Sequence, residues 1–176
     1  EGALTVAFVP VMTETLEKKG REVARKFVAA MMGTTMACLA LLSIAGTAGA
    51  WWLVWLFGSG FSQYEGRIEL AGDLTAVMFP YVWFAGMLAF AMGILNSLGK
   101  FFAPAFAPVL LNVSLILCGF LLFEPLNSMG IEPVFALAIG ALIGGILQLL
   151  LQIPALRSEG MLPRPTLDFR DPQVRT

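Results

Sequence analysis

Four long runs without a charged residue constrain this chain more than any other feature of its sequence. They extend over residues 27–56, 74–99, 101–123 and 133–156. Each run exceeds the about 20 residues that a helix needs to cross the hydrocarbon core of a bilayer. Only helices and closed barrels satisfy every backbone polar group in lipid, and these runs lack the alternation of a barrel. The sequence therefore predicts an all-α polytopic membrane protein, a helix bundle with four complete transmembrane spans.

The composition supports this class and excludes several others. Hydrophobic residues make up 58% of the 176 residues and charged residues only 13%, whereas a soluble domain carries about 25% charged residues. Histidine, the commonest general base and metal ligand, is absent. We find no catalytic constellation, phosphate-binding loop, metal-ligand spacing or aromatic-laced basic patch. We therefore expect no enzyme activity, no metal, no cofactor and no nucleic-acid partner.

A shorter apolar run opens the chain. Residues 2–13 carry no charge, but a dozen residues cannot cross a bilayer. The basic segment 14–26 follows, with three acid–base pairs at i,i+4 spacing that favour a solvated helical connection. We interpret residues 1–13 as the cytoplasmic half of a truncated transmembrane helix, and the chain as a piece of a longer polypeptide.

The charges predict which side of the membrane each loop occupies. If the four spans cross in succession, ten of the eleven basic residues fall on one side, and Arg67 is the exception. Basic loops are retained in the cytoplasm. We therefore place segments 14–26 and 157–176 in the cytoplasm, the second as a proline-containing linker. Segments 57–73 and 124–132 become the external loops.

Prolines within the spans are candidates for helix breaks or gating. They are Pro80 in the second complete span, and Pro104 and Pro108 in the first turns of the third. A proline in a membrane helix removes a backbone donor and leaves a carbonyl that a neighbour or water must satisfy. Broken helices of this kind are common in transporters, although a simple packing kink also explains each proline.

The fourth span combines small and polar residues at four-residue spacing. Ala136, Gly140 and Gly144 form a small-xxx-small face suited to close helix contact. Gln148 and Gln152 continue this series, with Gln148 near the face of Gly144 and Gln152 rotated away from Gly140, and their amides would either hydrogen-bond another helix or line a wet cavity. Three further polar residues lie in or beside the spans: Asn96, Lys100 and Asn112. Lys100 would snorkel, cap a helix C-terminus or contact an anion.

Two stretches resemble motifs of a known family. EGALTVAFVPVMTE is similar to a motif near the end of the second helix of the MurJ/MviN lipid II flippases, and GILNSLGKFFAPAFAPVLLNVSLI to their signature across the fourth and fifth helices. The tail GMLPRPTLDFRDP also resembles the family. The resemblance covers the chain from the middle of the second helix to just past the sixth. It implies most of the N-terminal lobe of a two-lobe exporter of the multidrug/oligosaccharidyl-lipid/polysaccharide superfamily.

The resemblance also implies a function and a location. These proteins move lipid II, an undecaprenyl-pyrophosphate-linked peptidoglycan precursor, from the cytoplasmic to the periplasmic leaflet by alternating access. The partners that the resemblance implies are lipid II, membrane lipids, and the first helix and C-terminal lobe of the same polypeptide. The implied location is the inner membrane of a bacterium. Another polysaccharide or drug exporter of the superfamily, or a non-transporting scaffold of cell-wall assembly, is the alternative.

Matching positions imply candidate substrate-cavity residues. Glu1 matches a glutamate beside the cavity, Asn96 and the stretch 104–108 match the connection between the fourth and fifth helices, and Asn112 matches an asparagine of the fifth. The full set of candidates is Glu1, Asn96, Lys100, Asn112 and Gln148. The cavity arginines that the family uses for the pyrophosphate fall outside this chain.

Overall fold

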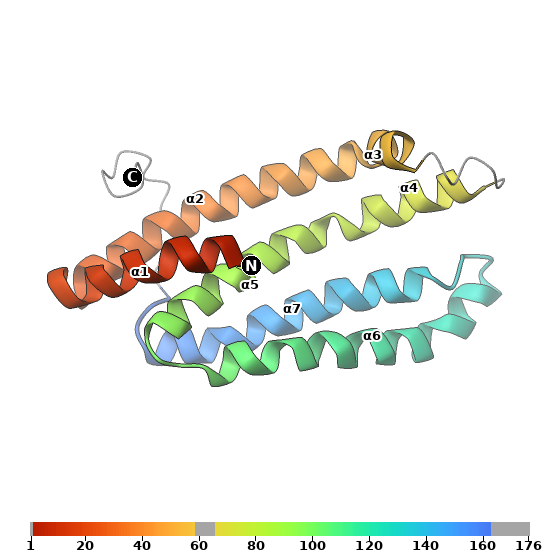
Figure 1. The fold of residues 1–176 in the computed structure, drawn as a ribbon. Helices are drawn as coiled ribbons and strands as arrows, with labels where there is room; N and C mark the ends of the chain where they lie inside the picture. The colour runs from red at the N-terminus through yellow and green to blue at the C-terminus, as the bar shows by residue number, and fades with distance from the viewer. Residues whose placement is uncertain (1, 59–65, 163–176) are drawn as a thin grey trace.

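The computed structural model describes residues 2–58 and 66–162, with side chains from residue 8 onward. Every regular element in these ranges is an α-helix (Figure 1). The helices are α1 (Gly2–Lys19), α2 (Arg21–Ala48), α3 (Ala50–Phe57), α4 (Arg67–Met78), α5 (Pro80–Ser97), α6 (Phe102–Ser128) and α7 (Phe135–Ser158). The candidate residue Glu1 and most of the expected linker 157–176 lie outside the described residues.

Four stretches of helix are long and apolar enough to cross a membrane. They are Arg21–Ala48, the paired helices α4 and α5 over Arg67–Ser97, Phe102–Ser128 and Phe135–Ser158. Their lengths, 24 to 31 residues, correspond to roughly 36–46 Å at 1.5 Å per residue, enough for a 30 Å hydrocarbon core. The structure thus confirms the predicted fold class, an all-α polytopic membrane protein.

Several helices extend beyond the uncharged runs. Helix α2 begins at Arg21 rather than at residue 27, α4 begins at Arg67 inside the expected external loop, and α6 continues to Ser128. A helix end in water tolerates charge, because its side chains remain solvated and can pair along the helix. Glu22 and Lys26 form such an i,i+4 pair at 3.6 Å in the first turns of α2. The absence of charge therefore marks the apolar layer better than it marks the helix ends.

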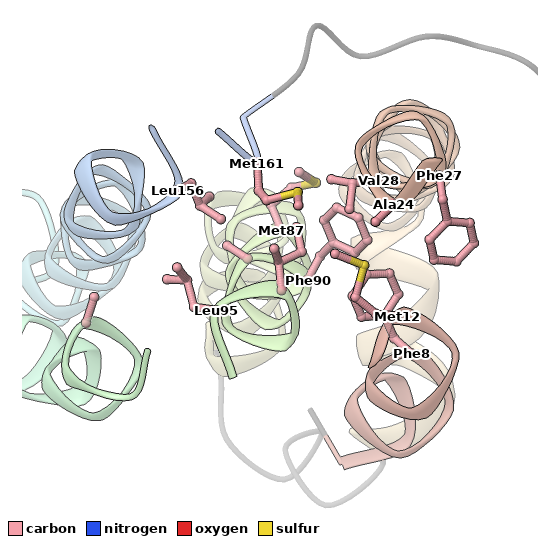
Figure 2. Close-up of a cluster of buried hydrophobic side chains, with 13 residues drawn as sticks. Phe8, Met12, Ala24, Phe27, Val28, Met87, Phe90, Leu95, Leu156 and Met161 are labelled. Carbon is pink, nitrogen blue, oxygen red and sulfur yellow. The ribbon is translucent and has the colours of Figure 1, made fainter. Parts of the chain in front are cut away.

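Helix α5 occupies the centre of the bundle. It packs against α1 and α2 on one side and against α7 on the other, and α7 packs most extensively against α6 (Figure 1). A buried cluster lies where α1, α2 and α5 meet, with the Phe8 ring stacked 5.7 Å from Phe27 and edge-on at 5.0 Å to Phe90 (Figure 2). Leu156 and Met161 extend this cluster to the end of α7.

Helix α6 is the most exposed of the four candidate spans. Only 11% of its most apolar stretch of 18 residues is buried inside the structure. Its outer side carries large apolar side chains, among them Phe102 and Phe120, which are 78% and 83% exposed. A soluble protein rarely presents so continuous an apolar surface, so this surface fits contact with lipid or with another apolar surface.

Candidate functional site

Three side chains on the contact between α6 and α7 donate hydrogen bonds to backbone carbonyls of the opposite helix. Ser114 Oγ donates to the Gly140 carbonyl at 2.7 Å. Gln148 Nε2 donates to the Ala107 carbonyl at 3.0 Å, and Gln152 Nε2 to the Ala103 carbonyl at 3.1 Å. All three donors are buried. The glutamines therefore join two helices, which is the first of the two roles that their spacing predicts.

The register of this polar contact comes directly from the sequence. The two glutamines are four residues apart on α7, and their acceptors Ala103 and Ala107 are four residues apart on the antiparallel α6. A proline follows each acceptor in the stretch APAFAP. The Oε1 atoms of both glutamines are buried without a partner among the described residues. Each carboxamide thus uses only its donor side in this contact.

Glycines bring the backbones of α6 and α7 close together. A Cβ placed on Gly140 would lie 3.1 Å from the Leu115 Cα, and one placed on Gly144 would lie 3.1 Å from the Leu111 Cα. Contacts this short with backbone atoms would accept a methyl group only if the neighbouring helix moved away by a few tenths of an ångström. The small-xxx-small face therefore allows the close approach that brings the glutamine amides within reach of the α6 carbonyls.

Pro104 and Pro108, candidates for a helix break or for a packing kink, lie within a continuous α6. The helix runs from Phe102 to Ser128 through both of them. Pro104 lies in the first turn, where backbone donors have no intrahelical acceptor, so its missing N–H costs nothing. Pro108 removes one backbone donor, and its side chain is exposed.

Pro80 does coincide with an interruption. Helix α4 ends at Met78, α5 begins at Pro80, and Phe79 separates them. Because proline lacks an N–H, the Ala76 carbonyl loses its i+4 donor. Thr47 Oγ1 of α2 lies 3.5 Å from this carbonyl, and Ser43 Oγ donates to the Phe79 carbonyl at 3.2 Å. The Thr47 hydroxyl thus faces the carbonyl that lacks its backbone donor, whereas the Phe79 carbonyl also accepts from the Val82 N–H at 3.0 Å.

The remaining candidate residues do not gather around one cavity. Asn96 is half-buried in the last turn of α5, whereas Asn112 is exposed on α6. Gln148 is 3% exposed within the contact between α6 and α7. Lys100 lies in the turn between α5 and α6, and pairs with Glu159 just past the end of α7. Their predicted part in a substrate cavity stays a prediction.

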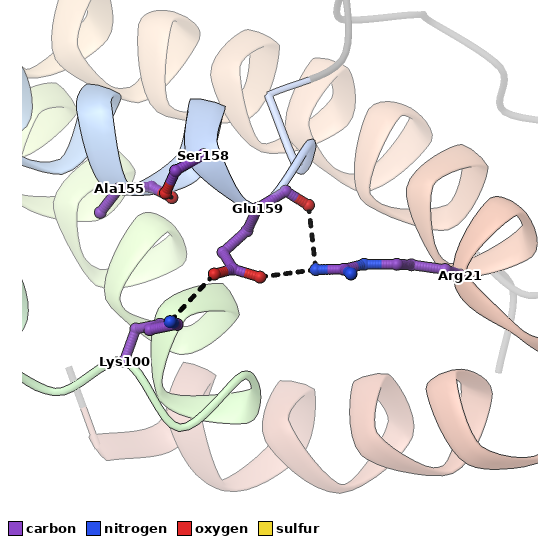
Figure 3. Close-up of polar contacts among 5 residues, drawn as sticks. All are labelled: Arg21, Lys100, Ala155, Ser158 and Glu159. Carbon is purple, nitrogen blue, oxygen red and sulfur yellow. Dashed lines mark hydrogen bonds and ion pairs between the residues drawn. The ribbon is translucent and has the colours of Figure 1, made fainter.

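Glu159 joins three segments that are distant in sequence (Figure 3). Its Oε1 lies 3.1 Å from Lys100 Nζ, and its Oε2 lies 2.5 Å from Nη2 of Arg21 at the start of α2. The same Nη2 donates to the Glu159 carbonyl at 3.3 Å. The hydrogen bond from Lys100 and the nearby charges hold the pKa of the Glu159 carboxyl below its ordinary value.

Sequence reasoning did not single out Glu159. Its partners are 59 and 138 positions away, and no periodicity connects such residues. The only available signal is that Glu159 is a lone acid between Arg157 and Arg164 in a basic segment. The interpretation of Lys100 as a snorkelling or capping residue also omitted this ion pair, for the same reason.

Two hollows lie at different places on the molecule. An apolar groove of about 530 Å³ lies between α2 and α5, with Ser43, Thr47, Pro80 and Trp83 among its lining residues. A polar hollow of about 910 Å³ lies between the start of α4 and the connection from α6 to α7, with charged residues Arg67, Asp73 and Glu132 in its lining. Both are open, and neither contains the glutamine contacts.

The family of this chain follows from its similarity to known proteins. The family model described as "Lipid II flippase MurJ" matches residues 1–176. The chain belongs to the MurJ family. A lipid II flippase MurJ of Burkholderia cenocepacia is 38% identical over 179 residues, which cover 99% of this chain and 34% of that relative. A probable lipid II flippase MurJ of Vibrio cholerae is also 38% identical, with the same shares covered.

A more distant MurJ relative shows the same pattern of coverage. The probable lipid II flippase MurJ of Bdellovibrio bacteriovorus is 34% identical, over 99% of this chain and 33% of its own length. The chain thus spans about a third of the length of the curated MurJ proteins it matches. The resemblance of its two quoted motifs to this family is confirmed.

Proposed function

We propose that this chain is part of a lipid II flippase, which moves the undecaprenyl-pyrophosphate-linked precursor from the cytoplasmic to the periplasmic leaflet by alternating access. The observation that carries this proposal is the match of the MurJ family model along residues 1–176. The relatives named as lipid II flippases and the four membrane-spanning helices support it. The transport is non-enzymatic and needs no cofactor in this lobe.

The distribution of charge supports one orientation in the bacterial inner membrane. The turn between α1 and α2, the turn between α5 and α6, and the end of α7 lie together at one end of the bundle (Figure 1). The described basic residues at that end are Lys18, Lys19, Arg21, Arg25, Lys26, Lys100 and Arg157. Arg67 is the only described basic residue at the opposite end. By the positive-inside rule the basic end is cytoplasmic.

The packing supports a division of mechanical roles during transport. Close glycine contacts and three interhelical hydrogen bonds make α6 and α7 a single hairpin that moves as one body. The interruption at Pro80, where the Ala76 carbonyl lacks its backbone donor and the Thr47 hydroxyl of α2 lies 3.5 Å away, is the point at which α4 and α5 change their relative angle. Alternating access uses this combination of rigid elements and localised hinges.

Lipid II accessibility at the outer leaflet tests the proposal in cells. We expect depletion of the full-length protein to reduce the lipid II that an externally added modifying enzyme reaches, and re-expression to restore it. Unchanged accessibility after depletion contradicts the flippase assignment and favours an exporter of another polysaccharide or of a drug.

Reconstitution separates a transporter from a scaffold. We expect the purified full-length protein in proteoliposomes to move lipid II between leaflets, since alternating access needs no other cell-wall protein. A scaffold would affect accessibility in cells and leave lipid II in its original leaflet in the proteoliposomes.

A further inference from the structure

The basic end of the bundle carries more positive charge than its acids neutralise. Three ion-pair groups are formed there: Glu14 with Lys18, Glu22 with Lys26, and Glu159 with both Arg21 and Lys100. The third group has two cations on one carboxylate and therefore a net charge of +1. Two further arginines are exposed near this group in the sequence. Arg25 lies one turn after Arg21, and Arg157 lies two residues before Glu159. This end is thus a concentrated cationic surface.

Glu159 organises the two cations that it binds. Its side chain is only 17% exposed, whereas Arg21 and Lys100 are 63% and 56% exposed. The carboxylate holds the guanidinium on one oxygen and the ammonium on the other, and the two cations reach it from different directions (Figure 3). Each cation keeps further N–H donors that point to no described acceptor. These remaining donors are available to a second anion.

Apolar rings beside this cluster favour a lipid over a free anion. Phe101 and Phe102 directly follow Lys100 and are 61% and 78% exposed. The Phe102 ring stacks on Phe106 one turn further along α6, at 5.9 Å. Cations followed by exposed aromatic rings are what a membrane interface contains, with headgroups at the level of the charges and acyl chains at the level of the rings.

We propose that the cluster of Arg21, Lys100 and Glu159, which we call the basic clamp, binds the headgroup phosphate of an anionic phospholipid, with the acyl chains along Phe102 and Phe106. The phosphate is held by the free donors of the two cations, and the neighbouring arginines add attraction. This binding concerns a resident membrane lipid and does not depend on which molecule the protein transports. Its test contains no lipid II, so it and the proposed function can fail separately.

Native mass spectrometry of the full-length protein, released from bilayers of equal phosphatidylglycerol and phosphatidylcholine with matched acyl chains, tests the basic clamp. We expect preferential retention of phosphatidylglycerol. The double variant Arg21→Gln, Lys100→Gln should reduce this preference roughly thirtyfold, because each of the two basic residues contributes about 1 kcal/mol at an anionic surface. The matched control, Lys18→Gln with Lys26→Gln, removes the same charge from the same end, and its loss should be clearly smaller, because each of these lysines is paired with a glutamate of its own.

Three results would overturn the proposal. They are equal retention of the two phospholipids by the unmodified protein, equal losses in the clamp and control variants, and displacement of the lipid by millimolar inorganic phosphate. If the clamp variant does not fold, Arg25→Gln with Arg157→Gln tests the same surface without breaking any ion pair found in the structure. We expect this second variant to lose several-fold of the preference, and an undiminished preference would contradict the proposal.

Discussion

Gln152 shows how a single buried side chain contributes to this fold. Its amide donates one hydrogen bond to Ala103, while its Oε1 is buried without a partner. We expect Gln152→Leu to cost only about 0.6 kcal/mol of unfolding free energy, the average for interhelical hydrogen bonds in membrane proteins. Gln152→Glu should cost about 3 kcal/mol, because it places an ionisable group between apolar helices. Chemical unfolding in detergent micelles measures the unfolding free energy of both variants. A larger loss in the leucine variant than in the glutamate variant would contradict the single weak hydrogen bond seen at Gln152.

Other single residues show which features of the site the sequence can predict. The glutamines of α7 are recognisable because their spacing continues the series of small residues that face α6. Glu159 is not, because its role arises only when the turn before α2, the turn before α6 and the end of α7 converge in space. A local pattern predicts local geometry, whereas an ion pair between three segments depends on the tertiary fold.

At the scale of helices, the contact between α6 and α7 depends on particular glycines. Gly144→Ala brings its Cβ to 3.1 Å from the Leu111 Cα and 2.8 Å from the Leu111 Cδ1. We expect a loss of about 1–3 kcal/mol, the usual cost of overpacking. Gly119→Ala is the matched control on the same contact, because its Cβ would meet only the flexible end of Leu137, at 3.3 Å. Alanine favours the helix there, so similar losses in both variants would refute this account.

The helices also show where sequence reasoning succeeds and where it fails. Uncharged runs locate the four spans because charge is excluded from hydrocarbon, but α2 and α4 begin at basic residues outside those runs. Pro80 coincides with an interruption, whereas α6 continues through Pro108. Pro104 leaves α6 intact because it lies in the first turn of the helix, but this reason does not apply to Pro108. Proline within a span therefore does not by itself predict a break.

Across the whole molecule, α5 connects two groups of helices that otherwise share few contacts. The aromatic cluster joins α5 to α1 and α2. On the other side of α5 lies α7, which packs in turn against α6. The Glu159 ion pairs add a second connection at the basic end, from α2 through Glu159 to the turn before α6. A change in the relative position of the two groups of helices would therefore alter the ion pairs of the Glu159 carboxylate.

The pH dependence of unfolding measures that second connection. The fold lowers the pKa of Glu159 below its ordinary value of 4.5, mainly through the hydrogen bond from Lys100. The unfolded chain then binds the proton more readily, so the stabilisation is fully present above that ordinary value and is lost as the pH falls through the lowered value. We expect Glu159→Gln to lower the melting temperature modestly at pH 7, and the difference from the unmodified protein to shrink towards zero in acid. Glu69→Gln, at the opposite end of the bundle, is the control. A difference that stays constant with pH would show that Glu159 contributes through packing and not through its charge.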